Sequence, residues 1–570
     1  MVIHSPLPDI KIPETGIIQF LFDNNPHYIP QNRKVLIDAF TGESLTYGKL
    51  KDNILRFAAT LQDKFDFKHG DVVAIYSPNQ IDYSVLLLGT IAAGGSATPA
   101  NPAYTPKELA YQMEMTGAKI LIAHPSNVEL ALIAADMVSL PKERIFVFGG
   151  SAINGVLPYS QVFFNERRAS PIELTAEETK DSVAYLCFSS GTTGKLSIYV
   201  FGETGRYNHS NPLDAIHSNM TSNVMQFHTL DHAFINADKD TALGVLPFYH
   251  MFALSVLLHS MLYMGIPLYV MPQFDLVRFC KTVQEQKITF SALVPPIILL
   301  LAKNPVVDQY DITSLKLAIC GAAPLGKELS HQVRKRIPTM IVKQGYGLTE
   351  TSPCAIIEPT DRVIDAGSVG VLMSSMTAKI VDEEGKEVAT GERGELWLKG
   401  PNIMKFSHSY IDLKGYINNP EQTAGCIDED GYFHSGDVAV QDENGHFFIV
   451  DRIKELIKYK GFQVPPAELE AILVNSPIVA DCAVIGVYDA DQATELPRGY
   501  ITLNPDIPES EDTANTIKKF VSDQVVHYKQ LRSIRFIKEV PKSPAGKILR
   551  KVLREMAAEE EKQLRLKNKL

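Results

Sequence analysis

The sequence is poor in the features that stabilise small secreted proteins and membrane proteins. Its six cysteines lie far apart, with no Cys-x-x-Cys pair, which argues against a disulfide framework or structural zinc and favours a reducing compartment. Residues 1–16 lack the apolar core of a signal peptide, and the longest apolar runs, around Tyr83–Gly94 and Phe290–Ala302, are short or broken by proline. We therefore expect a soluble intracellular protein without a membrane span.

An excess of basic charge is missing as well. The formal net charge is −11, which argues against a nucleic-acid partner but is compatible with a local basic groove for an anionic ligand. A chain of 570 residues is too long for one hydrophobic core, so we expect two to four domains.

A loop rich in glycine and hydroxyl residues follows an early apolar run. Val183–Phe188 predicts a buried strand, and Ser189–Lys195 (Ser-Ser-Gly-Thr-Thr-Gly-Lys) follows it directly. The two glycines allow backbone N–H groups to converge and the hydroxyls add donors, an arrangement that suits a polyphosphate. A polar surface turn is the alternative, and the spacing does not fit a Walker loop.

Strands and helices alternate up to about residue 350. Asp71–Ser77 is an expected strand, Ile81–Ala93 a buried helix, and Thr105 with Glu108 a capping box at the start of the next helix. The alternation predicts an α/β fold with a mainly parallel sheet covered by helices.

Four of the later expected strands each end at a loop of small or proline residues. The loops are Pro247–His250, Pro295-Pro296, Gly321–Pro324 and Gln344–Glu350. In parallel α/β sheets, ligands bind beyond the carboxyl ends of the strands. These loops and Ser189–Lys195 are therefore predicted to line one cleft.

The character of the sequence changes after residue 366. Short strands such as Ala378–Val381 and Gly394–Lys399 alternate with turns, which predicts a β-rich subdomain. A lysine-dense segment, Lys454–Lys460, follows Asp451-Arg452, and the remainder predicts a small α+β domain. We expect a large N-terminal domain (residues 1–451) and a small mobile C-terminal domain (residues 452–570).

Six motifs occur in order along the chain: Ser189–Lys195, Gln344–Glu350, Gly394–Gly400, Tyr432–Asp437, Val450–Gln463 and Pro541–Lys547. Together they resemble the adenylate-forming superfamily of acyl-CoA synthetases, luciferases and peptide-synthetase adenylation domains, and most of all the 4-coumarate–CoA ligase type. The resemblance covers about residues 30 to 555.

The resemblance implies a reaction in two steps. A carboxylate attacks the α-phosphorus of ATP and expels pyrophosphate, and the thiolate of coenzyme A then attacks the acyl-adenylate. Joining two anions requires cations and N–H donors at the α-phosphate, with Mg²⁺ on the leaving group. The expected cofactors are therefore ATP, Mg²⁺ and coenzyme A, and the expected substrate is a small carboxylic acid.

The resemblance also assigns roles to single residues. Lys547 would bridge the carboxylate and the α-phosphate, Glu350 would hold Mg²⁺ with Thr192 or Thr193 nearby, and Asp437 would accept the ribose hydroxyls. Each has an ordinary alternative as a solvated lysine or a turn carboxylate. The expected catalytic residues are Lys547, Thr193, Glu350 and His250, and the expected nucleotide- and coenzyme-binding residues are Ser189, Ser190, Gly191, Thr192, Thr193, Gly194, Lys195, Gln344, Gly345, Tyr346, Gly347, Thr349, Asp437, Arg452, Lys458, Lys460, Gly461 and Gln463.

One lysine cannot serve the first step and also leave room for coenzyme A. The family rotates its small domain at a hinge, so that different faces meet the cleft in the two steps. By resemblance the hinge lies at Asp451–Lys454, and Lys460-Gly461 lie near the route of the coenzyme A thiol. The alternative for these lysines is a solvated charged face.

The expected acyl pocket is apolar and of small to medium size. That composition suits an aryl, arylpropenoyl or medium-chain acyl group, because a very polar substrate would leave its groups unpaired. His250 would act as a gate beside the pocket, with a core histidine as the alternative. The expected lining is His250, Met251, Phe252, Ala322, Ala323, Gly345 and Leu348.

Two surplus segments interrupt otherwise regular motifs. Leu196–Ile216 separates the phosphate loop from the His217-Ser218-Asn219 that restores the pattern, and Phe406–Lys414 interrupts a second motif. Both begin and end abruptly, so our hypothesis is a translated intron remnant or an alternative gene model; a real, tolerated surface insertion is the rival. Sequencing the mature transcript decides between them.

The last three residues, Asn568-Lys569-Leu570, resemble a Ser-Lys-Leu peroxisomal address, which predicts binding to a peroxisomal import receptor. An ordinary polar helix end is the alternative, with a cytoplasmic location. Two other functions stay open: adenylation with an acceptor other than coenzyme A, and a catalytically impaired protein with an altered phosphate loop.

Overall fold

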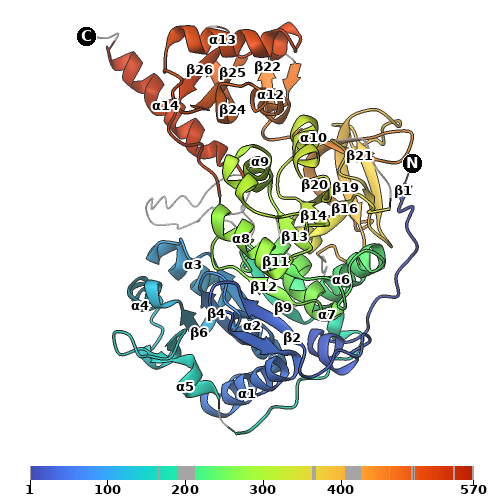
Figure 1. The fold of residues 1–570 in the computed structure, drawn as a ribbon, viewed down its shortest axis with the longest axis vertical. Helices are drawn as coiled ribbons and strands as arrows, with labels where there is room; N and C mark the ends of the chain where they lie inside the picture. Colours follow the sequence, from blue (N-terminus) through green and yellow to red (C-terminus); the bar gives the residue numbers. More distant parts are fainter. Residues whose placement is uncertain are drawn as a thin grey trace.

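The computed structural model describes residues 2–164, 166–188, 212–361, 367–404, 425–460, 462–489, 492, 494–543 and 546–567. Figure 1 shows two large α/β layers, a β-rich region beside them and a small domain at the opposite end of the long axis from the first layer. Among the described residues, no helix combines the length and the apolar character that crossing a membrane requires.

The first large sheet is parallel except at one edge. Its strand order is β10-β9-β5-β4-β6-β7-β8, and only β10 runs antiparallel to its neighbour. The strands are β10 (Pro212–Ile216), β9 (Val183–Phe188), β5 (Ser96–Ala100), β4 (Val72–Tyr76), β6 (Ala118–Ala123), β7 (Ile145–Val147) and β8 (Leu157–Pro158).

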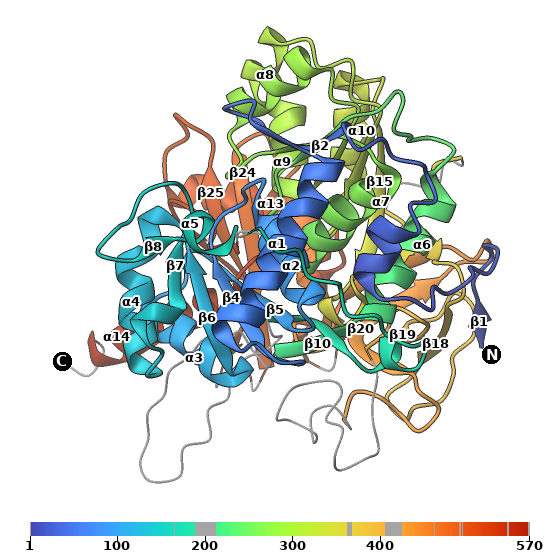
Figure 2. The ribbon, with the colours of Figure 1, turned by 90° about the horizontal axis from the view of Figure 1, so that it is seen from below.

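Alternating side chains of this sheet bury two hydrophobic faces. Val73 and Ile75 of β4 join the core that includes α1 (Tyr47–Phe65) and α2 (Tyr83–Ala92). Their neighbours Ala74 and Tyr76 pack against α3 (Pro106–Thr116) and α4 (Val128–Met137) on the opposite face. Figure 2 shows these helices beside the strands of the sheet. Helices on both faces explain why these strands are continuous apolar runs.

The second large sheet contributes most of the loops around the site. Its order is β17-β16-β15-β14-β13-β11-β12-β2-β3, with parallel pairing from β15 to β2. The strands are β17 (Val371–Leu372), β16 (Cys354–Ile357), β15 (Ile341–Gly347), β14 (Leu317–Cys320), β13 (Phe290–Leu293), β11 (Ala242–Gly244), β12 (Leu268–Val270), β2 (Lys34–Asp38) and β3 (Ser44–Thr46). Helices α8 (Leu276–Gln286), α9 (Pro295–Lys303) and α10 (Lys327–Arg336) alternate with its strands along the chain.

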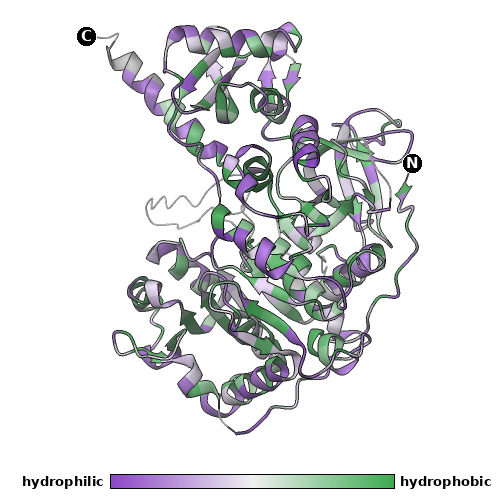
Figure 3. Ribbon diagram, viewed as in Figure 1, coloured by the Kyte–Doolittle hydropathy of each residue, from purple (hydrophilic) through white to green (hydrophobic). Residues whose placement is uncertain are grey.

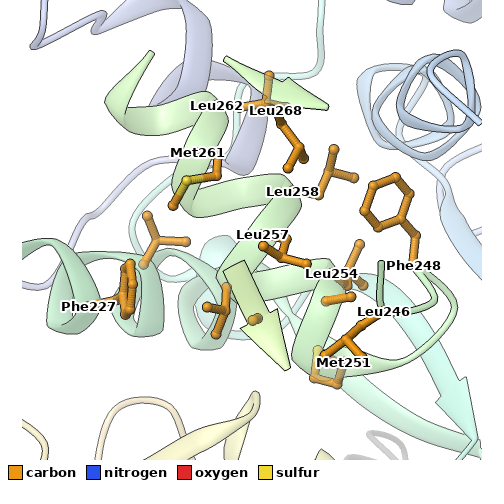
Figure 4. Close-up of a cluster of buried hydrophobic side chains, with 14 of the residues drawn as sticks. Phe227, Leu246, Phe248, Met251, Leu254, Leu257, Leu258, Met261, Leu262 and Leu268 are labelled. Atoms are coloured by element: carbon orange, nitrogen blue, oxygen red, sulfur yellow. The ribbon is translucent and has the colours of Figure 1, made fainter. Parts of the chain in front are cut away.

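A buried π-helix, η5 (Ala253–His259), connects the two large sheets. His259 forms a hydrogen bond of 2.9 Å to the hydroxyl of Tyr185 on β9, while Leu257 lies against Gly244 of β11. Figure 4 shows its leucines packed with Met251, Phe248 and Phe227, the last from α6 (His217–Asp231). Because all seven η5 residues are buried, this helix fixes the relative position of the sheets.

The β-rich region is an antiparallel sheet with the order β1-β18-β19-β20-β21. Its strands are β1 (Ile3–His4), β18 (Thr377–Val381), β19 (Gly394–Lys399), β20 (Phe433–Gln441) and β21 (Phe447–Arg452). The pairing of β20 with β21 places Asp437 directly opposite Arg452. That register brings a carboxylate and a guanidinium together at the end of the N-terminal domain.

The C-terminal domain is a small α+β unit beyond β21. It contains a sheet of β24 (Val479–Asp489), β25 (Thr494–Leu503) and β26 (Ser533–Phe536), and a hairpin of β22 (Ile457–Tyr459) and β23 (Phe462–Val464). Its helices are α12 (Pro466–Leu473), α13 (Glu511–Ser522) and α14 (Arg550–Lys567). In Figure 3, α14 is largely hydrophilic, in contrast to the central strands of the large sheets.

The predicted fold class is confirmed: α/β with parallel sheets, a β-rich region and a small C-terminal α+β domain. The capping box of Thr105 and Glu108 is present at the start of α3. The end of the surplus segment Leu196–Ile216, for which a surface insertion was the rival interpretation, forms a strand. Pro212–Ile216 is strand β10 and pairs with β9 over its whole length. Residues 196–211 of that segment, and all of Phe406–Lys414, lie outside the described residues.

A buried ion pair lies directly before the Gln344–Glu350 motif. Lys343 Nζ lies 2.6 and 2.5 Å from the two carboxylate oxygens of Asp231 and donates a hydrogen bond of 3.0 Å to Thr360. We expect Lys343→Met to destabilise the protein by about 3–5 kcal/mol, because it leaves a buried carboxylate without its cation. Urea unfolding measures the change.

The control is Lys287→Met, which removes an exposed ion pair with Asp311 and should cost about 1 kcal/mol or less. Equal losses of stability in the two variants would contradict the structural role of the buried pair.

Candidate active site

A cleft of about 1480 Å³ lies where the second sheet, the β-rich sheet and the C-terminal domain meet. All four predicted loops line it: Tyr249-His250 after β11, Pro295-Pro296 after β13, Gly321–Pro324 after β14 and Gln344–Glu350 in and after β15. The prediction of one shared cleft is confirmed for these loops. Ser189–Lys195 lies outside the described residues, so its place in the cleft stays a prediction.

Asp437 forms the centre of a buried polar cluster in this cleft. One carboxylate oxygen accepts a hydrogen bond of 2.7 Å from the Tyr346 hydroxyl, and the other lies 3.2 Å from Arg452 Nε. Burial raises the pKa of Asp437, although Arg452, Tyr346 and Lys547 oppose this rise. Each carboxylate oxygen has a second lone pair, so the cluster retains acceptors for the hydroxyls of a ligand.

Lys547 reaches the same cleft from the C-terminal domain. Its backbone forms a tight turn with Ser543, in which the Lys547 N–H donates to Ser543 Oγ at 3.2 Å and its carbonyl accepts from the Ser543 N–H at 2.8 Å. Gly546 in this turn has φ +78°, and a Cβ there would lie 3.3 Å from Pro296 and Val294 of the N-terminal domain. Glycine thus allows both the turn and the close approach of the two domains.

The surroundings of Lys547 combine burial with charges of both signs. Burial is the main cause that lowers the pKa of Lys547 from 10.5 to about 8, and Arg452 lowers it further. Asp437, Glu455 and Glu350 act in the opposite direction. Lys547 therefore lies within electrostatic reach of the two carboxylates, Glu350 and Asp437, that the sequence analysis places around the nucleotide.

His250 lines the same cleft and lies near Lys547. Burial and the nearby Lys547 lower the pKa of His250 to about 4, so its imidazole is neutral at pH 7. The N–H of Phe252 donates to His250 Nδ1 at 3.3 Å, which leaves Nε2 as the protonated nitrogen.

The predicted acyl-pocket residues fall into two groups. His250, Phe252, Ala322, Ala323, Gly345 and Leu348 all line the cleft. Met251 is 1% exposed and packs in the core with Leu246 and Leu254, as Figure 4 shows, and it is not part of the cleft wall. Its side chain and those of its two neighbours in sequence leave the backbone in different directions, which sequence alone does not fix.

Glu350 lies in a short 3-10 helix, η7 (Thr349–Thr351), and its side chain lines the cleft. Its backbone carbonyl accepts a hydrogen bond of 2.9 Å from the Met404 N–H. The described residues contain no group of three or more His, Cys, Asp or Glu positioned for a metal. One cleft carboxylate nevertheless fits Mg²⁺ bound to a nucleotide, because this ion takes most ligands from phosphates and water.

Sequence reasoning missed a buried carboxylate behind the Gln344–Glu350 motif. Glu358 Oε2 accepts a hydrogen bond of 2.6 Å from the Gln344 N–H, and burial raises the pKa of Glu358 to about 7. The Gln344 side chain accepts from the Leu325 N–H at 3.0 Å and donates to the Ser368 carbonyl at 3.0 Å. Gln344 thus fixes the loop after β14 to the motif, a role that only long-range contacts reveal.

Three predicted residues lie outside this cleft. Lys458, Lys460 and Gln463 belong to the β22–β23 hairpin and its turn, and none is part of the cleft wall. Gln463 donates a hydrogen bond of 3.2 Å to Glu383 of the N-terminal domain, and the Lys460 ammonium lies 5.6 Å from the Tyr459 ring centroid. Gly461 lies outside the described residues. Lys458, Lys460 and Gln463 therefore occupy a face of the C-terminal domain different from the one that carries Lys547.

Two parallel α/β sheets, a β-rich region and a small domain that places a lysine in their common cleft define the class of adenylate-forming enzymes. A family model described as AMP-binding enzyme matches residues 22–196 and 216–406, and one described as AMP-binding enzyme C-terminal domain matches residues 468–547. The chain belongs to the AMP-binding enzyme family. The first model passes over residues 197–215, within the segment that the sequence analysis identified as surplus.

The chain is similar to individual 4-coumarate–CoA ligases over almost its whole length. The chain is 35% identical to 4-coumarate-CoA ligase 1 of Narcissus pseudonarcissus over 98% of this chain and 97% of the relative. It is 34% identical to 4-coumarate–CoA ligase 1 of Petroselinum crispum, over 97% and 96% of the two chains. The predicted class of adenylate-forming acyl- or aryl-CoA ligases is thereby confirmed at the level of the family.

Solved structures agree with this fold. ATP-bound MatB from Rhodopseudomonas palustris superposes with a TM-score of 0.80 at 26% identity, covering 95% of this chain and 98% of that one. A benzoate CoA ligase from Burkholderia xenovorans LB400 superposes with a TM-score of 0.79 at 22% identity, covering 95% and 99%. The latter likeness concerns the fold alone.

The pKa of Lys547 leads to a pH prediction for the unliganded enzyme. The ammonium is present below a pKa of about 8 and is lost above it, so kcat/KM for adenylation should fall as the pH rises through about 8. Pyrophosphate–ATP exchange measured from pH 6 to pH 10 gives this profile. In Lys547→Arg the alkaline fall should disappear, because arginine stays charged. An unchanged alkaline limb in that variant would assign the titration to another group.

The turn at Gly546 gives a second prediction. Gly546→Ala introduces strain at positive φ and contact with Pro296, so it should displace Lys547 and lower the exchange rate by about 10-fold or more. The matched control is Gly391→Ala, at φ +88° with no atom within 4 Å of the added Cβ. Both variants should lose some thermal stability, and only Gly546→Ala should lose exchange. Equal exchange rates would show that the turn does not position the lysine.

Proposed function

We propose that this protein uses ATP to convert a carboxylic acid to an acyl-adenylate and then transfers the acyl group to coenzyme A. The products are acyl-CoA, AMP and pyrophosphate. One observation carries the proposal: Lys547 of the C-terminal domain enters a cleft that holds Asp437, Arg452 and Glu350 and that continues past His250 into an apolar region. Such a cleft accommodates an anionic nucleotide and the apolar body of an acid together.

Lys547 and Arg452 can offset the negative charge that comes together in the first step. The attacking carboxylate and the α-phosphate are both anions, and a desolvated ammonium between them offsets their repulsion. A pKa of about 8 leaves Lys547 mostly charged at pH 7, and a bound anion would raise this pKa further. The residue therefore holds its proton while it orients the carboxylate.

Asp437 and Tyr346 are suited to bind the nucleoside. Carboxylate oxygens accept hydrogen bonds from the two hydroxyls of a ribose, and the Tyr346 ring lines the same wall. The hydroxyl of Tyr346 donates to Asp437 at 2.7 Å, which holds both side chains in one orientation. We infer that the ribose binds at Asp437 and that adenine stacks on Tyr346.

Neutral His250 is suited to border the acid rather than to bind phosphate. It donates at most one hydrogen bond from Nε2 and carries no charge that would compete with Lys547 for the carboxylate. Beyond it, the apolar wall fits an aryl, arylpropenoyl or medium-chain acyl group. We therefore propose that the substrate is an acid of one of these three classes.

The second step requires another arrangement of the C-terminal domain. Lys460 and Gly461 are proposed to lie near the coenzyme A thiol after a rotation about Asp451–Lys454, and Lys458 and Gln463 are proposed to contact the adenylate. The lysine-dense part of the sequence begins at Lys454, just after strand β21 ends at Arg452. The Asp451 carboxylate also accepts from the Ala467 N–H at 2.9 Å, so a hinge there would have to release or carry this contact.

Magnesium is proposed as the metal that accompanies ATP. Glu350 would hold it, together with the hydroxyl of Thr192, and the bound ion would offset charge on the phosphates. Omitting Mg²⁺ with excess EDTA should abolish exchange, and full activity under those conditions would refute this assignment.

Peroxisomal import remains a proposal based on Asn568-Lys569-Leu570, which lie outside the described residues. A fluorescent protein that carries the last twelve residues should colocalise with a peroxisomal marker. The same fusion without the tripeptide should remain in the cytosol. Diffuse fluorescence of both fusions would refute the proposal.

The proposed activity is tested by acid-dependent exchange of labelled pyrophosphate into ATP, over aromatic acids and C6–C12 fatty acids. Addition of coenzyme A should then release AMP and form the acyl-CoA. Lys547→Ala should lose exchange by at least about 100-fold, because electrostatic stabilisation of this kind contributes that much. It should still transfer an acyl group from synthetic acyl-adenylate to coenzyme A.

The control is Lys519→Ala, which removes an exposed lysine of α13 paired with Asp523 and should leave exchange unchanged. No exchange with any acid would favour a catalytically silent protein. Exchange without acyl-CoA formation would favour a different acceptor.

A further inference from the structure

One face of α6 carries buried amides in place of the hydrocarbon that usually covers a buried helix face. Asn219, Asn223 and Gln226 are four and three residues apart, a spacing that puts side chains on the same side of a helix. Each is at most 2% exposed. Buried amides must pair their donors and acceptors, so this face has to form hydrogen bonds with the elements that cover it.

The covering element is Pro401–Met404, the segment that follows β19. Asn219 Nδ2 donates to two carbonyls of this segment, each at 2.9 Å. Gln226 Nε2 donates to Asn402 Oδ1 at 3.1 Å and to the Ser374 carbonyl at 2.7 Å. Asn402 is fully buried, and neither Asn402 nor the amides of α6 line the cleft.

The same segment also contacts the short helix that carries Glu350. Asn402 Nδ2 donates to the Thr351 carbonyl at 2.7 Å and to the Cys354 carbonyl at 2.8 Å. The Met404 N–H donates to the Glu350 carbonyl at 2.9 Å. A helix of three residues such as η7 has few hydrogen bonds of its own, so these contacts fix the backbone at Glu350 and directly after it.

The amides form one chain of hydrogen bonds from α6 to η7. Asn223 Nδ2 donates to Gln226 Oε1 at 2.9 Å, Gln226 donates to Asn402, and Asn402 donates to the Thr351 carbonyl. Asn223 Nδ2 also donates directly to the Cys354 carbonyl at 2.9 Å. Each amide thereby orients the next, and the chain connects a long buried helix to a turn at the wall of the cleft.

We propose that Asn402 is a positioning residue that, through this amide chain, holds Glu350 where it binds the Mg²⁺ of the nucleotide. This inference rests on the proposed function, in which Glu350 holds that ion. Mg²⁺ demands nearly ideal octahedral geometry, so a carboxylate on a loosely held turn binds it weakly. Removing a group that orients a metal ligand typically costs about 10- to 100-fold in metal affinity.

Asn402→Leu tests the inference, because leucine has a similar volume and donates no hydrogen bond. In the unliganded protein, hydrogen exchange followed by mass spectrometry should become about 10-fold faster at residues 348–354. The Kd of a non-hydrolysable ATP analogue with Mg²⁺, measured by calorimetry, should rise by about 10-fold or more. The Kd of AMP in EDTA should change by less than about 2-fold, because its binding does not involve the ion.

Asn79→Leu is the matched control. Asn79 is also buried, its Nδ2 donates to two carbonyls at 2.8 and 3.4 Å, and its Oδ1 accepts from the Phe248 N–H at 2.7 Å. This pattern of donors and acceptors is that of Asn402, but these partners lie on the loops after β11 and β12. Both variants should lose thermal stability. Only Asn402→Leu should speed hydrogen exchange at residues 348–354 and weaken the Mg²⁺ complex relative to AMP.

Gln226→Met provides a second variant in case Asn402→Leu does not fold. Methionine nearly matches glutamine in length but gives no hydrogen bond to Asn402, while Asn402 keeps its own donors to the carbonyls of Thr351 and Cys354. The effects on exchange and on the Mg²⁺ complex should therefore have the same direction and be smaller, about 2- to 10-fold. Unchanged values in a folded Gln226→Met protein would overturn the inference.

The two nucleotides keep this inference distinct from the proposed activity. Absence of pyrophosphate exchange with every acid, together with selective weakening of the Mg²⁺ complex in Asn402→Leu, would refute the proposed function and support the positioning role. Pyrophosphate exchange in the unsubstituted protein, with Asn402→Leu weakening both nucleotides equally, would support the function and overturn the positioning role. Hydrogen exchange that rises equally over the whole chain in Asn402→Leu would overturn it as well.

Discussion

The placement of one desolvated cation between two domains is the constraint on which the active site depends. Lys547 belongs to the C-terminal domain, yet Asp437 and Glu350 of the N-terminal domain affect its pKa, together with burial and with Arg452 at the domain boundary. A lysine leaves water at a cost that only nearby anions offset. The close approach of Gly546 to Pro296 and Val294 therefore matters for chemistry, because it brings the cation to those anions.

This constraint also separates the cleft into two chemical regions. Asp437, Arg452 and Tyr346 form a hydrogen-bonded group whose members fix one another. Phe252, Val256 and Ile357 contribute hydrocarbon side chains to another part of the cleft wall. The two regions meet where the small-residue loops at the carboxyl ends of β14 and β15 allow side chains and ligands to approach the backbone.

The sequence predicted the fold and the cleft loops because those features have local signals. Strands β13, β14 and β15 are apolar runs ended by Pro, Gly or small residues, and parallel topology brings such ends together. The prediction for Lys547 likewise depended on a local turn motif. Glu358 carried no local signal, since its partner, the Gln344 N–H, is fourteen residues away along the chain. Met251 was assigned to the pocket by resemblance to the family, but its side chain packs in the core.

The sequence by itself determined the class of fold, the order of its domains and the residue types at the polar end of the cleft. These follow from hydrophobic periodicity, turn residues and motifs, all encoded over short stretches. Only the tertiary structure decided that Lys458 and Lys460 lie away from the cleft wall, and that Glu358 binds the Gln344 backbone. Those outcomes depend on burial and on partners distant in sequence, and both arise only when the packed elements exclude water.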